Sequence, residues 1–139
     1  RCLVGSEMCI RDRNTSVTMA SLACGFVIDT LLMVNNFRDR EQDAISGKKT
    51  IVVRLGARAG LILYFLLGLA ACWSCFYFVT EGRLWAAILP QIYLLFHILT
   101  TMKMARINRG KELNAILGET SRNMLLFGIL LTAGLLIPT

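Results

Sequence analysis

The residues best suited to chemistry lie in one stretch, "VNNFRDREQDAISGKKTIVVRLG", Val34 to Gly56. Three oxygen-bearing side chains in it, Asn35, Asp39 and Asp43, are spaced four residues apart. On a helix each would be turned about 40° from the one before, so the three would form one stripe. Carboxylate and amide oxygens suit a hard cation. Mg²⁺ in particular takes one or two carboxylates and completes its shell with water and substrate phosphate oxygens.

Basic residues accompany this stripe. Arg38 and Arg54 lie in the same stretch, and Lys48 and Lys49 follow Gly47, a residue that lets the chain turn. A metal ion and cations beside an apolar segment would suit a lipid-linked phosphate or diphosphate. The same mixture of charges is also typical of a solvated loop at a helix end, and spacing alone leaves both interpretations open. The two adjacent asparagines, which offer oxygen ligands without extra charge, favour a binding site.

The composition places the chain among membrane proteins. Its 139 residues are 55% hydrophobic, with a mean hydropathy of +0.60, which is too apolar for an ordinary soluble domain. The net charge is +6, but the charges are clustered, which argues against a nucleic-acid-binding face. Clustered basic residues in a membrane protein are typical of orientation signals.

Apolar segments of the chain predict an all-α, polytopic transmembrane bundle, because lipid offers no partner to unpaired backbone groups. A helix needs roughly 20 residues to cross a bilayer. The predicted transmembrane helices are residues 17–36, 59–79, 84–102 and 121–137. Pro90 is expected to kink the third. The first and third connections are rich in Lys and Arg and the second is short, so the first and third are expected on the cytoplasmic side.

Several residues in the apolar segments carry other chemistry. His97, the one histidine, is expected to be structural rather than catalytic, and Cys72 and Cys75 to be small membrane-helix residues rather than a redox or metal pair. Four aromatic residues are mostly expected to face lipid or the interface, without a chemical role: Trp73, Trp85, Tyr77 and Tyr93. Asp29 lies mid-helix, where a charge costs about 3 kcal/mol, and it either faces a cavity or is tolerated near water. Close helix packing is expected at four glycines: Gly60, Gly68, Gly128 and Gly134.

The first thirteen residues differ from the rest. The segment "CLVGSEMCIRDR", Cys2 to Arg13, is polar and lacks the apolar core and small-residue cleavage site of a signal peptide. Codons for Leu3 to Asp12 can be chosen to match the transposon-end adapter of short-read sequencing libraries. We therefore expect residues 1–13 to be translated adapter and residues 14–139 to be the C-terminal part of a longer protein. The alternative is a short polar tail.

Two segments resemble a known family. The stretch "NNFRDREQDAISGKKTIVVRLG" resembles the second aspartate-rich motif of the UbiA-type intramembrane prenyltransferases. Shared features are the paired Asn, Arg-Asp, a second Asp four residues later, Gly-Lys-x-Thr and Val-Arg-Leu-Gly. The C-terminal "LNAILGETSRNMLLFGILLTAGLL", residues 113–136, is similar to the ending of the 1,4-dihydroxy-2-naphthoate polyprenyltransferase branch. The resemblance is strongest at residues 34–56 and 113–136.

The resemblance implies a protein of nine transmembrane helices in a bacterial inner membrane, with these four as the sixth to ninth of one domain. Two aspartate-rich motifs would face each other at the cytoplasmic end, where Mg²⁺ holds a polyprenyl diphosphate. The polyprenyl group would pass to 1,4-dihydroxy-2-naphthoate with loss of carbon dioxide, giving demethylmenaquinone. The lipid bilayer is the expected environment, and no nucleic-acid partner is expected.

The resemblance also implies roles for individual residues. The implied metal ligands are Asn35, Asp39 and Asp43, of which the two aspartates are the expected catalytic residues. The implied diphosphate ligands are Arg38, Lys48 and Lys49, and the first lysine is favoured because it occupies the Gly-Lys-x-Thr position. Asn36 would support the metal ligands. Arg54 would either contact substrate or tie the loop to the next helix.

The sequence departs from the family in holding one acidic motif where the family needs two. Glu112 and Glu119 are isolated and do not form a second motif. We therefore expect the full protein to be an enzyme and these 139 residues alone to be inactive. Other acceptors, namely hydroxybenzoate, homogentisate, haem or chlorophyllide, stay open. A non-catalytic four-helix membrane protein is the alternative from another class, and a second acidic motif in the gene would exclude it.

Overall fold

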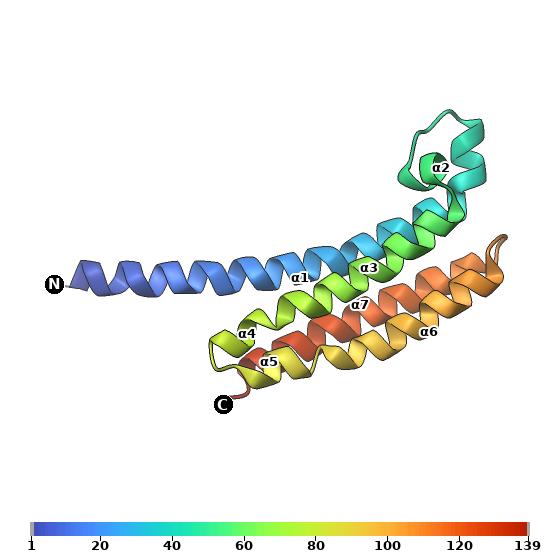
Figure 1. The fold of residues 1–139 in the computed structure, drawn as a ribbon. Coiled ribbons are helices and arrows are strands. Elements are labelled where there is room, and N and C mark those ends of the chain that lie inside the picture. Colours follow the sequence, from blue (N-terminus) through green and yellow to red (C-terminus); the bar gives the residue numbers. More distant parts are fainter. Residues whose placement is uncertain (1, 139) are drawn as a thin grey trace.

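A computed structural model describes the backbone of residues 2–138 and the side chains of residues 15–138, and every regular element within it is a helix (Figure 1). The helices are α1 (Cys2–Ile45), α2 (Ile51–Leu55), α3 (Ala57–Cys75), α4 (Tyr77–Thr80), α5 (Leu84–Ile88), α6 (Gln91–Ile107) and α7 (Leu113–Leu136). The predicted all-α class is confirmed. The interpretation of residues 1–13 as adapter concerns side chains outside the described ones and stays a prediction.

Three helical segments are long and apolar enough to cross a membrane, among the residues described: Thr15–Ile45, Ala57–Thr80 and Leu84–Ile107. They correspond to the first three predicted helices. The fourth predicted helix forms α7, which begins at Leu113, well before residue 121. Glu119, Arg122 and Asn123 lie in the first half of α7, and among the described residues α7 is not one of the segments apolar enough to cross a membrane.

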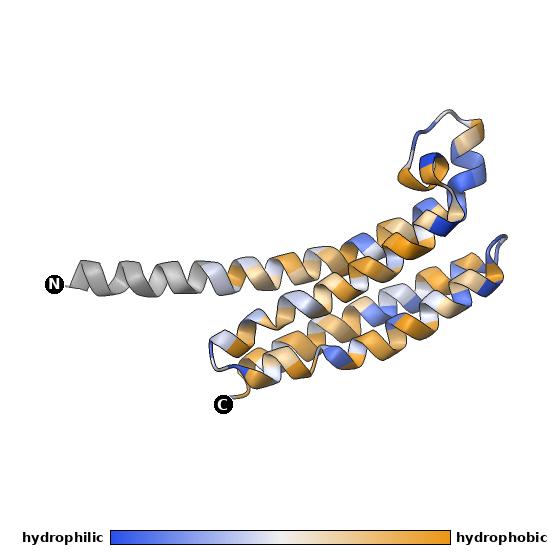
Figure 2. Ribbon diagram, viewed as in Figure 1, coloured by the Kyte–Doolittle hydropathy of each residue, from blue (hydrophilic) through white to orange (hydrophobic). Residues whose placement is uncertain are grey.

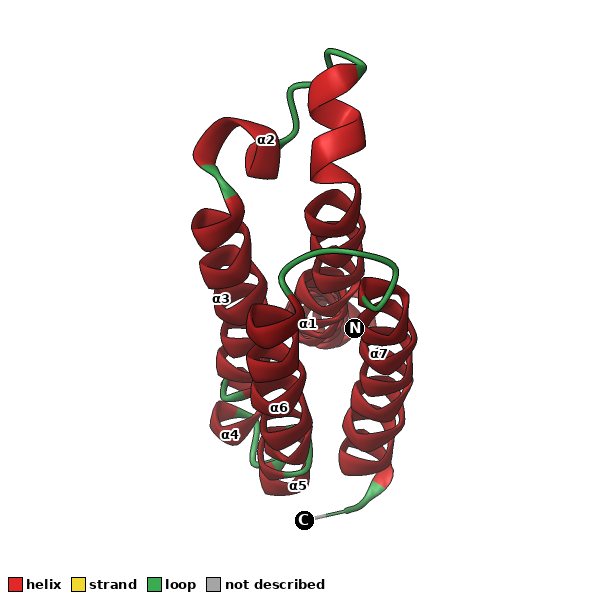
Figure 3. Cartoon of the chain, turned by 90° about the vertical axis from the view of Figure 1, so that its right-hand side faces the viewer, coloured by secondary structure: helices red, strands yellow, loops and turns green. Residues whose placement is uncertain are grey.

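The long helices form a bundle in which α1 and α6 each pack against both α3 and α7 (Figure 3). Large apolar side chains on the outer faces, such as Ile62 (58% exposed) and Leu95 (64%), suit contact with lipid. The segment around α2 and the α6–α7 connection lie at one end, and α4, α5 and the C-terminus lie at the other (Figure 1). Hydrophilic residues gather at the first of these ends (Figure 2). The two basic connections thus share one end, as their charge predicted.

The third predicted helix is broken at its proline. α5 ends at Ile88 and α6 begins at Gln91, directly after Pro90, which has no N–H to continue the helical ladder. The Gln91 side-chain amide donates to the carbonyl oxygens of Ala87 (3.0 Å) and Cys72 (3.2 Å). The break is therefore tied to α3, and the predicted kink is confirmed.

Apolar packing fixes the polar end of the bundle. Val34 and Phe37 of α1 are fully buried, and they pack in one cluster with Val52 of α2 and with Leu113 and Ile116 of α7. This cluster holds the last turns of α1 against the rest of the bundle. The functional groups on those turns therefore sit on a packed support.

A buried histidine joins the middle of the bundle. His97 of α6 is fully buried, and its ring nitrogens lie 3.0 Å from the Tyr93 hydroxyl and 3.0 Å from the Tyr64 carbonyl oxygen. The expectation of a buried, hydrogen-bonded structural histidine is confirmed. The expectation that Tyr93 faces lipid or the interface is wrong, because Tyr93 is 1% exposed and bonds to this histidine.

Close approach at the predicted glycines is confirmed for three of the four. A Cβ on Gly68 would lie 2.2 Å from the His97 ring, and one on Gly134 would lie 2.6 Å from the Ala86 backbone. A Cβ on Gly60 would lie 3.1 Å from the Val52 Cγ2. Gly128 is the exception, because a Cβ there would meet nothing within 4 Å.

Candidate functional site

The stripe of oxygen ligands lies on one continuous helix. The apolar run that predicted a helix over residues 17–36 continues as α1 to Ile45. No Gly or Pro interrupts it after Gly25, and the burial of Phe37 anchors the extension. Asn35, Asp39 and Asp43 consequently occupy consecutive turns, where neighbouring Cβ atoms lie about 5–6 Å apart.

A glycine ends α1 and turns the chain back on its last acidic residue. Gly47 has φ +76°, a left-handed conformation that favours glycine. The N–H of Gly47 donates to the Ala44 carbonyl (3.3 Å), and the N–H of Lys48 donates to the Asp43 carbonyl (2.9 Å). This pair of bonds forms a Schellman motif. The motif returns Lys48 over Asp43, and the Lys48 Nζ lies 3.3 Å from the Asp43 Oδ1.

Arg38 and Asp39 form a second, bidentate ion pair. The Arg38 Nε and Nη2 donate to the two Asp39 carboxylate oxygens at 2.6 and 2.8 Å. The Arg38 Nη1 donates to the Asn114 Oδ1 on α7 at 3.1 Å. The site therefore includes a residue from the far end of the sequence. Asn114 was not predicted as a site residue, although it belongs to the "LN" that begins the C-terminal similarity.

The neighbouring arginine of α1 docks the α6–α7 connection. Arg40 Nη2 donates to the Asn108 carbonyl oxygen at 2.6 Å, and Arg40 Nη1 donates to the Phe37 carbonyl oxygen at 2.8 Å. Next to it, the Arg109 Nε lies 3.4 Å from the Glu41 Oε1. Arg40 was not predicted to have a role. Because these contacts hold residues 108–114 over the end of α1, they bring Asn114 within reach of Arg38.

The donor set fits a hard divalent cation in part. Asn35 and Asn36 are half-buried, and their side chains make no hydrogen bond with the residues the structure describes. Within residues 15–138, no three His, Cys, Asp or Glu side chains come together as metal ligands. Two carboxylates and an amide on one face make an open, incomplete ligand set. Such a set is compatible with Mg²⁺, which usually keeps several waters and binds substrate phosphates.

Three other predicted or singled-out residues lie away from these contacts. The side chains of Lys49 and Arg54 are exposed, and neither is paired with any described residue. The tie from Arg54 to the next helix is thus not formed, and its contact with substrate stays a prediction. Asp29 is also exposed, and it follows Ile28 on α1.

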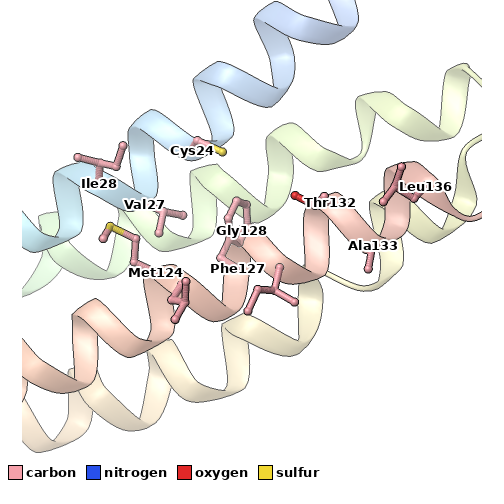
Figure 4. Close-up of a pocket in the computed structure, with 11 residues that line it drawn as sticks. Cys24, Val27, Ile28, Met124, Phe127, Gly128, Thr132, Ala133 and Leu136 are labelled. Atoms are coloured by element: carbon pink, nitrogen blue, oxygen red, sulfur yellow. The ribbon is translucent and has the colours of Figure 1, made fainter.

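An apolar groove runs along the same pair of helices that carries the Arg38–Asn114 contact. It has a volume of ≈ 710 Å³ and lies between α1 and α7 (Figure 4). Side chains of both helices line it, among them Val27 and Ile28 of α1 and Met124, Phe127 and Leu136 of α7. The residue without a close neighbour, Gly128, also lines this groove. The family resemblance implies a cavity open to the membrane, but none of these lining residues was predicted from the sequence as part of it.

Arg38 is eleven positions beyond Val27 on α1, which corresponds to about 16 Å along the axis. The interface between α1 and α7 therefore carries a charged cluster at its polar end and an apolar groove further along. A molecule with a charged head and an apolar tail matches this arrangement.

Comparison with known proteins identifies the family to which this chain belongs. Residues 2–129 match the UbiA prenyltransferase family. The chain is also 31% identical over 125 residues to a 1,4-dihydroxy-2-naphthoate octaprenyltransferase of Haemophilus influenzae. That alignment covers 89% of this chain and 41% of the relative, so the chain spans about two fifths of the length of the relative. No solved structure matches the chain significantly. The match over nearly the whole sequence shows that the chain belongs to the UbiA prenyltransferase family.

Proposed function

We propose that the protein transfers a polyprenyl group from polyprenyl diphosphate to 1,4-dihydroxy-2-naphthoate, with loss of carbon dioxide, to give demethylmenaquinone. The observation that carries the proposal is the α1–α7 interface. Its polar end holds Arg38 within hydrogen-bond distance of both Asp39 and Asn114, and an apolar groove lies further along. The diphosphate would bind at the charged end and the polyprenyl chain would follow the groove.

The proposed metal ligands are Asn35, Asp39 and Asp43, with Asn36 in support. Mg²⁺, when bound, would neutralise charge that develops on the departing diphosphate. In the structure the two aspartates are paired with Arg38 and Lys48. On substrate binding these two cations would turn from the carboxylates to phosphate oxygens. Each charged group would thus keep a partner of opposite sign, which limits the desolvation penalty.

Lys49 is the third proposed diphosphate ligand. Its side chain is exposed and unpaired among the described residues, so it is free to reach an incoming anion. The groove lining would keep water away from the polyprenyl chain.

The acceptor is the finer part of the proposal. Its support is the name of the Haemophilus influenzae relative and the similarity at residues 113–136. Hydroxybenzoate and the other aromatic acceptors are the competing substrates within the family. The polar end of the bundle is proposed to face the cytoplasm of a bacterial inner membrane, because its two connections carry most of the Lys and Arg.

We further propose that a second acidic motif, encoded outside these 139 residues, completes the site, and that the 139 residues alone are inactive. The incomplete ligand set on α1 supports this. A long sequencing read across the codon for Asn14 in the source gene tests it. An open frame that continues upstream with apolar segments and an Asp-rich loop is the expected result. A start codon just before Arg1 would overturn this proposal.

A transfer assay with the complete gene product tests the function. The protein would be given Mg²⁺, radiolabelled octaprenyl diphosphate and either 1,4-dihydroxy-2-naphthoate or 4-hydroxybenzoate. The expected result is a decarboxylated prenyl naphthoquinol product with the first acceptor alone. Transfer to 4-hydroxybenzoate alone would show that the acceptor is 4-hydroxybenzoate and not 1,4-dihydroxy-2-naphthoate. Absence of transfer to any aromatic acceptor by folded protein would overturn the enzyme assignment.

A further inference from the structure

We infer that Asn114 is a positioning residue of the diphosphate site, acting through Arg38. The inference rests on the proposed function and extends it to a residue of α7. Its basis is the 3.1 Å bond from the Arg38 Nη1 to the Asn114 Oδ1, which joins positions 76 residues apart in the sequence.

The geometry of the guanidinium explains why a second anchor matters. Arg38 has five N–H groups, and the Asp39 carboxylate takes one from Nε and one from Nη2. Asn114 takes one from Nη1. One N–H on each Nη is left, and two such donors suit the oxygens of a phosphate.

Asp39 is also a proposed metal ligand, and for this reason Arg38 needs Asn114 as a second anchor. Once the Asp39 oxygens face a metal ion, they no longer hold Arg38 as tightly. Asn114 is then the anchor that keeps the guanidinium aimed at the diphosphate. An amide oxygen does this without adding charge, so it neither competes for the metal nor repels the substrate.

The docking of the α6–α7 connection makes Asn114 available. Arg40 bonds to the Asn108 carbonyl oxygen, and Leu113 is 1% exposed in the cluster beneath the site. Asn114 lies directly after this buried leucine, on the first turn of α7. Its backbone is therefore fixed by packing, while its side chain points to the end of α1.

The test uses the complete gene product and compares Asn114→Leu, which has similar size and no acceptor, with Asn114→Gln, which keeps an uncharged amide oxygen. The control is Ala115→Leu, which introduces the same side chain at the adjacent exposed position. For Asn114→Leu we expect kcat/KM for polyprenyl diphosphate to fall about tenfold, the loss of one hydrogen bond to a charged group. The KM for the aromatic acceptor should be unchanged. Asn114→Gln and Ala115→Leu should stay within about threefold of wild type, because each keeps an uncharged anchor for Arg38.

A double-mutant cycle separates positioning from a merely structural role. In an Arg38→Gln background, Asn114→Leu should have almost no further effect on kcat/KM, because the group it positions is gone. Additive losses would overturn the inference, and so would a fall in kcat with both KM values unchanged. If Asn114→Leu does not fold, a tenfold loss in Asn114→Gln would equally overturn it. Wild-type protein without any prenyl transfer would instead overturn the proposed function.

Discussion

Gly68 lies directly against the imidazole ring of His97, so closely that a Cβ on the glycine would lie 2.2 Å from the Nε2. The same Nε2 is 3.0 Å from the Tyr64 carbonyl oxygen, which can only accept a hydrogen bond. Nε2 therefore carries a proton, and in the neutral ring Nδ1 accepts from the Tyr93 hydroxyl at 3.0 Å. Through this one ring α3 and α6 are held together inside the bundle.

The first prediction concerns this contact. We expect Gly68→Ala to lower the free energy of unfolding by about 1–3 kcal/mol, because the new methyl group must displace a ring fixed by two hydrogen bonds. Thermal unfolding in detergent measures it. Gly128→Ala is the matched control in the same kind of helix, and it should unfold like wild type because a Cβ there meets nothing within 4 Å. Equal effects of the two changes would contradict the close contact.

The second prediction concerns the histidine itself. His97→Leu removes both bonds and leaves the buried Tyr93 hydroxyl short of a partner, so we expect a loss of about 1–3 kcal/mol in the free energy of unfolding. Prenyl transfer per folded molecule should be unchanged, since the ring lies inside the bundle and is fully buried. Turnover measured on the folded fraction checks this. A large fall in turnover with normal stability would give His97 a catalytic role.

Most of the site could be predicted from the sequence because its geometry is local. The four-residue spacing of Asn35, Asp39 and Asp43 needs only a continuous helix to become a stripe, and α1 supplies it up to Ile45. The turn at Gly47 likewise follows from the residue type, since a left-handed φ favours glycine.

The rest depended on contacts between segments far apart in the sequence. Asn114 reaches Arg38 only because α7 packs on α1, and no local pattern reports that packing. Tyr93 looked like an interfacial aromatic residue, yet α6 turns it inward to His97. Gly128 was expected at a helix contact but lines the groove instead. Helix periodicity gives the spacing of residues along one helix, and it does not tell which neighbour each face meets.

The third prediction separates the proposed metal ligands from the other acidic residue between them. Asp39→Asn or Asp43→Asn should lower the rate of prenyl transfer by about a hundredfold or more, as losses of one charge-stabilising group at a reacting centre do. Both variants should need a higher Mg²⁺ concentration than wild type to reach half of their maximal rate. Glu41→Gln is the control, because helical periodicity places Glu41 about 200° from Asp39, and among the described residues its exposed carboxylate is paired with Arg109. Its rate should stay within about threefold of wild type, as expected for a surface ion pair.

The fourth prediction distinguishes the two adjacent lysines. Lys48 is folded back onto Asp43 by the Gly47 turn, whereas Lys49 is exposed and unpaired among the described residues. We expect Lys48→Ala to raise the KM for polyprenyl diphosphate about tenfold, since a charged contact is lost. Lys49→Ala should raise it less. Titration of each variant with octaprenyl diphosphate gives the comparison, and a larger effect at Lys49 would reverse the assignment.

The fifth prediction concerns Asp29, which the helix periodicity places within about 20° of Asn36 but two turns deeper in the membrane segment. Its side chain is exposed and is not among the residues that line the groove, although the adjacent Ile28 is. We therefore expect Asp29→Leu to leave turnover unchanged. Membrane insertion should become more favourable by about 3 kcal/mol, the cost of a mid-helix charge. Turnover and the inserted fraction would be measured on the same membranes, with Ser21→Leu as an exposed control on the same helix. A fall in turnover without loss of insertion would instead place Asp29 beside the substrate, on the wall of a cavity that α1 shares with segments outside these 139 residues.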